Sequence, residues 1–142
     1  MAQRMTEREY LDFLLDRART ATLATVRTDG RPHAAPVWFD LDGDTLIFTT
    51  GKSTVKGRNM RRDPRVSLCI DEEEPPFHFV VIEGTAELKA KDPDLLHWAT
   101  RIGGRYMGAE RAEEYGRRNA DASELLVRIT PQKILAYKNI SD

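Results

Sequence analysis

Two Asp-Gly pairs constrain the fold of this 142-residue sequence more than any other feature. Asp29-Gly30 and Asp42-Gly43 separate runs that are rich in β-branched and aromatic residues. Asp-Gly between such runs is a strong hairpin signal, because both central residues tolerate a positive φ. The spacing therefore predicts an antiparallel meander of three strands, at 20–27, 33–41 and 44–50.

The rest of the sequence predicts further strands and short helices at the edge of the sheet. Thr6 and Glu9 have the spacing of a capping box and begin a helix at 7–18. The other predicted helices are 53–62, one opening at Asp92-Pro93 and broken at Gly103-Gly104, and 109–118. The other predicted strands are 65–70, 77–90 with a bulge or bend at Gly84, and 124–138, interrupted by Pro131. Since strands and helices do not alternate, we expect a mainly β (α+β) fold, an antiparallel barrel of six to seven strands with peripheral short helices.

Composition narrows the class of protein. Lys and Arg number 22 against 23 Asp and Glu, a net charge of −1, which attracts neither nucleic acid nor an anionic membrane. The single cysteine, Cys69, excludes an intrachain disulfide. The first residues contain no apolar h-region of a signal peptide, and no apolar run reaches membrane-spanning length, so we expect neither a leader nor a membrane span. We expect one cytoplasmic domain covering residues 1–142.

The tetrapeptide Gly51-Lys52-Ser53-Thr54 resembles the end of a P-loop. A P-loop needs another glycine five residues before Gly51, and Leu46 stands there. The backbone wrap around a triphosphate is therefore missing. The motif therefore argues strongly against a nucleoside triphosphatase, and the stretch needs another explanation.

That explanation is an anion site where the strand 44–50 leads into the helix 53–62. A helix N-terminus attracts phosphate through its unpaired amides and its dipole. Ser53 is the expected N-cap of the helix. The polar side chains at the end of the strand and in the helix that follows are Thr49, Thr50, Lys52, Ser53, Lys56, Arg58 and Asn59. We favour a site for a phosphate-bearing small molecule; an ordinary basic surface helix is the alternative.

An aromatic stretch precedes the anion strand. Pro36, Val37 and Trp38 lie on the predicted strand 33–41, next to 44–50 in the meander, and Pro36 leaves backbone groups free for a flat heterocycle. The histidines have no metal-ligand spacing, and no nucleophile–base pair is recognisable. A phosphate site beside an aromatic strand, without acid–base residues, suits a protein whose bound cofactor performs the chemistry.

Four segments, 23–39, 46–68, 81–88 and 128–137, resemble the pyridoxamine-phosphate-oxidase-like split β-barrel flavoproteins. Within that family, the run from Thr50 to Arg65 is most similar to the oxidoreductases that use the deazaflavin coenzyme F420. The resemblance implies a homodimer with cofactor sites at the interface, and a small-molecule substrate. It implies that Pro36, Val37 and Trp38 contact the ring, and that Thr49, Thr50, Ser53, Lys56, Arg58 and Asn59 belong to the phosphate motif. His78 and Phe79 would come from the other subunit.

The sequence departs from the vitamin B6 oxidases of this family in two positions and one motif. Val55 stands where an arginine is common, and Phe79 where a glutamine is common, and the C-terminal substrate-phosphate motif is missing. The expected function is hydride transfer between coenzyme F420 and a small conjugated substrate. An FMN-binding oxidoreductase and a non-catalytic flavin- or haem-binding protein are the alternatives. No catalytic residue is assigned. Tyr106, Arg105 and solvent are the candidate proton donors, the first two if the segment 92–118 caps the pocket.

Overall fold

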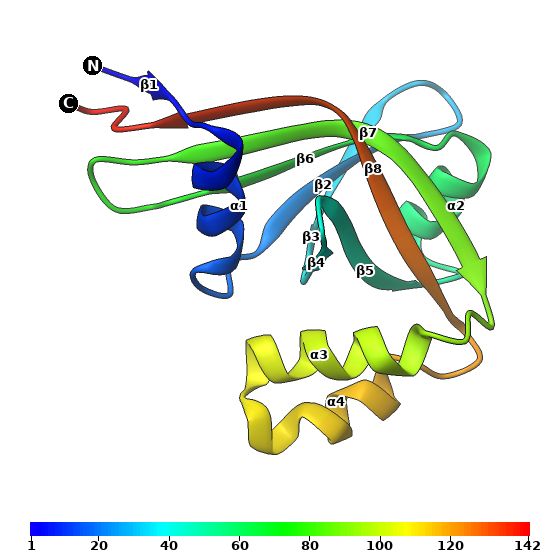
Figure 1. The fold of residues 1–142 in the computed structure, drawn as a ribbon. Coiled ribbons are helices and arrows are strands. Elements are labelled where there is room, and N and C mark those ends of the chain that lie inside the picture. Colours follow the sequence, from blue (N-terminus) through cyan, green and yellow to red (C-terminus); the bar gives the residue numbers. More distant parts are fainter.

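The computed structural model describes residues 1–142 as a curled antiparallel sheet with helices around it (Figure 1). The strands are β1 (Gln3–Arg4), β2 (Ala21–Val26), β3 (Pro32–Val37), β4 (Asp40–Asp42), β5 (Thr45–Gly51), β6 (Arg65–Asp71), β7 (Phe79–Ala90) and β8 (Glu124–Lys138). The helices are α1 (Glu7–Leu15), α2 (Val55–Arg62), α3 (Leu95–Met107), the 3-10 turn η1 (Ala109–Arg111) and α4 (Ala112–Arg118). None of these helices has the length and apolar character needed to cross a membrane.

The sheet has the strand order β3-β2-β6-β7-β8-β5-β4, and the short β1 pairs with β8. Every pair of neighbours is antiparallel. β3 and β4 are the two edges of the sheet although only Trp38 and Phe39 separate them in the sequence. The chain therefore crosses from one edge to the other, which curls the sheet into an open barrel. This confirms the predicted mainly β, antiparallel fold, with the two-residue β1 as an additional strand.

The hydrophobic core fills the inside of the curled sheet. It contains 20 buried residues, and Phe13 and Leu14 of α1 close one side of it. A smaller cluster, formed by Ile47, Leu95, Trp98 and Leu126, fixes α3 to β5 and β8. Figure 1 shows α3 and α4 side by side in a layer next to β5, with α2 at the other end of β7 from α1.

Two local predictions are confirmed. The Thr6 hydroxyl accepts a hydrogen bond from the Glu9 amide, and the Glu9 carboxylate accepts one from the Thr6 amide, so the capping box is formed. The register of β7 against β8 shifts between Glu83 and Gly84, as expected for a bulge. A Cβ atom on Gly84 would lie 2.4 Å from the carbonyl oxygen of Thr130, so the close approach of the two strands requires glycine.

Other predicted boundaries are wrong. The run 33–41 is two strands, because the chain leaves β2 after Val37 and joins β5 only at Asp40. α1 ends at Leu15 rather than residue 18. β8 continues through Pro131 as one strand, although its register against β7 shifts next to this residue. α2 begins at Val55, and its N-cap is Thr54, whose hydroxyl accepts a hydrogen bond from the Gly57 amide at 3.1 Å. Ser53 is exposed and does not cap the helix.

The expected break at Gly103-Gly104 is also wrong, since α3 runs through both residues to Met107. Cβ atoms at these positions would lie 2.7 Å from Tyr115 Cβ and 3.1 Å from Ala112 Cβ. The two glycines therefore allow α4 to pack closely on α3. The start of α3 differs too: the helix begins at Leu95, and the Asp92 carboxylate accepts hydrogen bonds from the Asp94 amide and from Arg128 instead of capping.

Candidate functional site

A cavity of about 340 Å³ lies where β5 leads into α2, and we call it the Lys56 cavity. Six of the predicted cofactor-binding residues line it: Pro36, Val37, Trp38, Thr49, Thr50 and Lys56. The sequence predicts that the strand 33–41, which carries the aromatic stretch, pairs with the strand 44–50. The structure brings them together differently, because β3 is hydrogen-bonded to β2 and only β4 is hydrogen-bonded to β5.

The α3–α4 layer holds Trp38 at the cavity. The indole ring stacks on the ring of Tyr106 at a centroid distance of 5.0 Å and an interplanar angle of 5°. Tyr115 of α4 lies 6.0 Å from the same ring. Because Trp38 lies in the crossing from β3 to β4, these contacts fix the bend of the chain as well as the indole.

Tyr106 and Arg105 have structural hydrogen-bond partners. The Tyr106 hydroxyl donates to the carbonyl oxygen of Arg19 at 2.6 Å and accepts from the Phe39 amide at 3.2 Å. Burial raises the pKa of this phenol. Arg105 donates to the carbonyl oxygens of Phe39, at 2.8 Å, and Leu14, at 2.5 Å. Neither residue lines the Lys56 cavity, so their candidacy as proton donors there has no support in the geometry.

The end of the cavity beside Lys56 is built by a compact turn. The Thr54 hydroxyl donates to the carbonyl oxygen of Gly51 at 2.9 Å and lies 3.2 Å from the Thr50 hydroxyl. Thr50 is buried and serves this turn, whereas Thr49 and Lys56 are partly exposed along the cavity. The first turn of α2 also lines the cavity through Thr54. A lysine ammonium at a helix N-terminus is a suitable place for a phosphate group.

Besides Thr54, two polar residues of this cavity are absent from the predicted site. Glu124 and Asn119 also line it, and Glu124 opens β8 directly opposite Gly51. Oε2 of Glu124 is buried without a hydrogen-bond partner. Burial, and secondly the nearby Asp121, raise the pKa of the Glu124 carboxyl, while Lys56 lowers it. Only the β5–β8 register brings Glu124 here, and no local sequence signal marks it.

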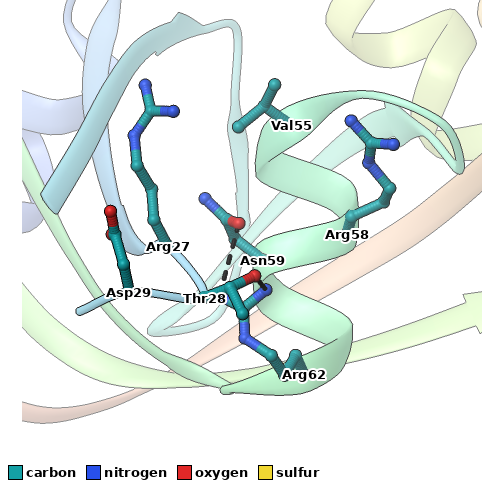
Figure 2. Close-up of a pocket in the computed structure, with 7 residues that line it drawn as sticks. All are labelled: Arg27, Thr28, Asp29, Val55, Arg58, Asn59 and Arg62. Atoms are coloured by element: carbon teal, nitrogen blue, oxygen red, sulfur yellow. Dashed lines mark hydrogen bonds between the residues drawn. The ribbon is translucent and has the colours of Figure 1, made fainter. Parts of the chain in front are cut away.

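Arg58 and Asn59 lie in a second cavity, of about 540 Å³, which we call the arginine cavity (Figure 2). It lies between α2 and the turn after β2, and its lining residues are Arg27, Thr28, Asp29, Val55, Arg58, Asn59 and Arg62. This corrects the prediction that Lys56, Arg58 and Asn59 converge on one anion, because Lys56 lines only the other of these two cavities.

Asn59 has a structural role in the arginine cavity. Its buried side-chain amide donates to the Thr25 hydroxyl at 3.0 Å, and its carbonyl oxygen accepts from Arg62 at 3.4 Å. Arg62 also donates to the Thr28 hydroxyl at 3.0 Å. These bonds attach α2 to β2 and thereby hold the helix that carries Lys56.

The remaining predicted residues line neither cavity. Ser53 is exposed on the turn before α2. His78 lies next to Phe13, with ring centroids 6.0 Å apart, and its Nδ1 accepts a hydrogen bond from the Asn139 amide at 3.1 Å. Phe79 packs on Tyr137 at 5.7 Å. A role for His78 and Phe79 at a cofactor therefore depends on a second subunit and stays a prediction. No group of three or more His, Cys, Asp or Glu side chains is placed to hold a metal ion.

The fold and the cavity together define a class: an open antiparallel barrel with a mixed polar and aromatic ligand cavity beside a strand-to-helix turn. The model of the family "Pyridoxamine 5'-phosphate oxidase" matches residues 6–138. The chain belongs to this family.

Individual relatives carry different functions in their names. A pyridoxine/pyridoxamine 5'-phosphate oxidase of Burkholderia mallei is 32% identical over 108 residues, which cover 75% of this chain and 50% of that protein. The chain thus spans about half the length of the curated relatives it matches. A conserved hypothetical protein of Mycobacterium tuberculosis has a TM-score of 0.82 and 29% identity, covering 96% of this chain and 87% of its own. A structure named F420 reductase has a TM-score of 0.64 and 25% identity, covering 87% of this chain and 94% of its own.

Proposed function

We propose that this chain is a coenzyme F420-dependent oxidoreductase, which transfers a hydride between the deazaflavin and a small conjugated organic substrate. The observation that carries the proposal is the Lys56 cavity, where a lysine at a helix N-terminus and an aromatic side chain meet in one space. Family membership supports a flavin-type cofactor. The similarity to an F420 reductase, together with the Thr50–Arg65 motif, favours the deazaflavin over FMN.

The residues of the cavity fit such a cofactor. Lys56 supplies one positive charge for a phosphate group, and the Thr49 hydroxyl a hydrogen bond beside it. Pro36 has no amide hydrogen and lies on an edge strand, so the backbone here is free of a ladder partner on one side. A flat ring system would lie along Pro36, Val37 and Trp38.

Within this proposal the protein binds and orients rather than reacts. When bound, the deazaflavin supplies hydride-transfer chemistry. Lys56 anchors the phosphate, and Trp38, clamped by Tyr106, defines the wall against which the ring is placed. Because Tyr106 and Arg105 hold backbone carbonyls, we assign no proton donor from them.

We also propose a homodimer with the cofactor at the interface. The family resemblance supports this proposal, because in such a dimer His78 and Phe79 of a second copy would lie across the Lys56 cavity. Sedimentation should give a mass about twice the 16.2 kDa of one chain. A cofactor-loaded protein that sediments as a single 16.2 kDa chain would contradict this part of the proposal.

Lys56→Ala tests the site itself. We expect the variant to lose about tenfold or more in affinity for F420, because one charge-assisted contact to phosphate is removed. The melting temperature of the protein without cofactor should change little, since the Lys56 side chain makes no ion pair or hydrogen bond within the chain. Lys52→Ala, on the same turn but outside the cavity lining, is the matched control. Equal loss in both variants would show a diffuse charge effect and contradict a specific anchor.

A further inference from the structure

Glu124 is the feature of the Lys56 cavity that phosphate binding leaves unexplained. It is the first residue of β8 and pairs with Gly51, so its backbone position is fixed by the sheet. Its side chain lines the cavity, and the buried Oε2 has no hydrogen-bond partner in the chain. A buried polar atom without a partner is costly, and a charged one more so.

The neighbours of Glu124 limit what can satisfy it. The charged groups that act on its carboxyl are Lys56 on α2 and Asp121 in the turn before β8. Asp121 is occupied, because its Oδ1 accepts hydrogen bonds from the amide and the hydroxyl of Ser123. Neither Lys56 nor any other side chain donates a hydrogen bond to Glu124. A partner for Oε2, either a water molecule or a group of a ligand that displaces it, therefore comes from outside the chain.

The chemistry of that partner follows from charge. A second anionic group of a ligand would be repelled by the Glu124 carboxylate, whereas an anion at Lys56 is attracted by the ammonium. A neutral hydrogen-bond donor is the group that a carboxylate accepts best. The cavity therefore offers an anion position at Lys56 and a hydroxyl position at Glu124.

We propose that Glu124 is a ligand-binding residue of the Lys56 cavity, whose carboxylate accepts a hydrogen bond from a hydroxyl group of the bound cofactor. The inference rests on the proposed function, because it takes a phosphate-bearing cofactor as the occupant. Tight binding then requires that the cofactor carry a hydroxyl group within hydrogen-bond distance of Glu124. A ligand that places an anionic group at this position is rejected.

The test is a titration of F420 and of FMN into the wild-type chain and into Glu124→Gln, followed by fluorescence. The glutamine has the same shape but no charge, so the strong charge-assisted bond is lost. We expect the Kd to rise about tenfold or more for the cofactor that the wild-type chain binds, the range for a hydrogen bond to a charged acceptor. The melting temperature of the cofactor-free variant should stay equal or rise, because the charge on a carboxyl group whose buried Oε2 has no partner is removed.

Two further variants separate this role from others. Glu124→Asp keeps the negative charge, but its side chain is one methylene shorter and no longer reaches the ligand hydroxyl. The affinity of this variant for the cofactor should therefore also fall while its fold is maintained. Asp121→Asn removes a carboxylate close to Glu124 but outside the cavity lining, and its Kd should change by less than about threefold.

The possible results are distinct. If the wild-type chain binds F420 and Glu124→Gln binds it equally well, the inference is wrong while the proposed function stands. If the wild-type chain binds FMN but not F420, the proposed function fails, and the inference is judged on FMN alone. If Glu124→Gln loses affinity together with a large drop in melting temperature, Glu124 is a structural residue and the inference is again wrong. If the wild-type chain binds neither F420 nor FMN, the proposed function fails and the inference fails with it.

Discussion

At the scale of single residues, two carboxyl groups show how opposite environments give opposite roles. Asp92 is buried and accepts hydrogen bonds at 2.8 Å from both Arg128 and the Asp94 amide. The hydrogen bond from Arg128 is the main reason why its pKa is lowered from 3.8. Glu124 has a buried oxygen with no donor, and burial raises its pKa. We interpret the satisfied carboxylate as structural and the unsatisfied one as a place for a ligand.

The Asp92–Arg128 pair predicts a pH dependence of stability. Because the pKa of Asp92 is lowered in the folded chain, its contribution is present in full above about pH 4 and is lost as pH falls through the lowered value. Asp92→Asn should therefore be less stable than the wild-type chain at neutral pH. The difference between their urea midpoints should shrink as pH falls below about 4.

The matched control for this pair is Asp94→Asn. Its exposed carboxylate lies 3.7 Å from the same guanidinium, so we expect a change within about 1 kcal/mol at neutral pH. A stability difference between Asp92→Asn and the wild-type chain that stays constant from neutral pH down to pH 2 would show that the carboxylate charge is not the cause.

At the scale of elements, the position of α2 against β5 depends on Gly57, and no local sequence pattern indicates this role. A Cβ atom on Gly57 would lie 2.4 Å from the carbonyl oxygen of Gly51, so the helix touches the end of β5 directly. The same turn contains the bond from the Gly57 amide to the Thr54 hydroxyl. Gly57 therefore sets how closely the start of α2 approaches the end of β5, the strand that carries Thr49.

Gly57→Ala should move α2 away from β5. We expect a loss of about 1–3 kcal/mol in the free energy of unfolding, as for other overpacked sites, although alanine is the better helix former. Chemical denaturation measures the effect. Arg61→Ala, exposed on the same helix, is the control and should lie within about 0.5 kcal/mol of the wild-type chain. A stabilised Gly57→Ala variant would mean that helix propensity outweighs the close contact.

The elements differ in how far the sequence predicts them. Thr6, Glu9 and the Asp-Gly turns act through neighbours in the chain, so their patterns predict local structure correctly. The predicted helix break at Gly103 is wrong. A glycine that breaks a helix and a glycine that lets a second helix pack closely give the same sequence pattern, and only tertiary contacts distinguish them. Serine and threonine are both favourable N-cap residues, so the sequence does not distinguish Ser53 from Thr54. The hydrogen bond from the Thr54 hydroxyl to the carbonyl oxygen of Gly51 favours Thr54.

At the scale of the whole molecule, the crossing of the chain from β3 to β4 positions one wall of the Lys56 cavity. It brings Trp38 from one edge of the sheet to the α3–α4 layer, and β8 brings Glu124 to the end of β5. The sequence predicts Pro36, Val37, Trp38 and Lys56 because they lie in contiguous motifs. It does not predict Glu124 or Asn119, nor the separation of Arg58 from Lys56, since these follow from long-range packing.

The central claim is that the Lys56 cavity binds the deazaflavin cofactor. The most direct measurement is a parallel fluorescence titration of the purified wild-type chain with F420 and with FMN at one pH and one ionic strength. We predict saturable binding of F420, with one cofactor per chain and an affinity at least about tenfold higher than for FMN, a difference of about 1.4 kcal/mol. Micromolar binding of FMN without binding of F420 would contradict the account.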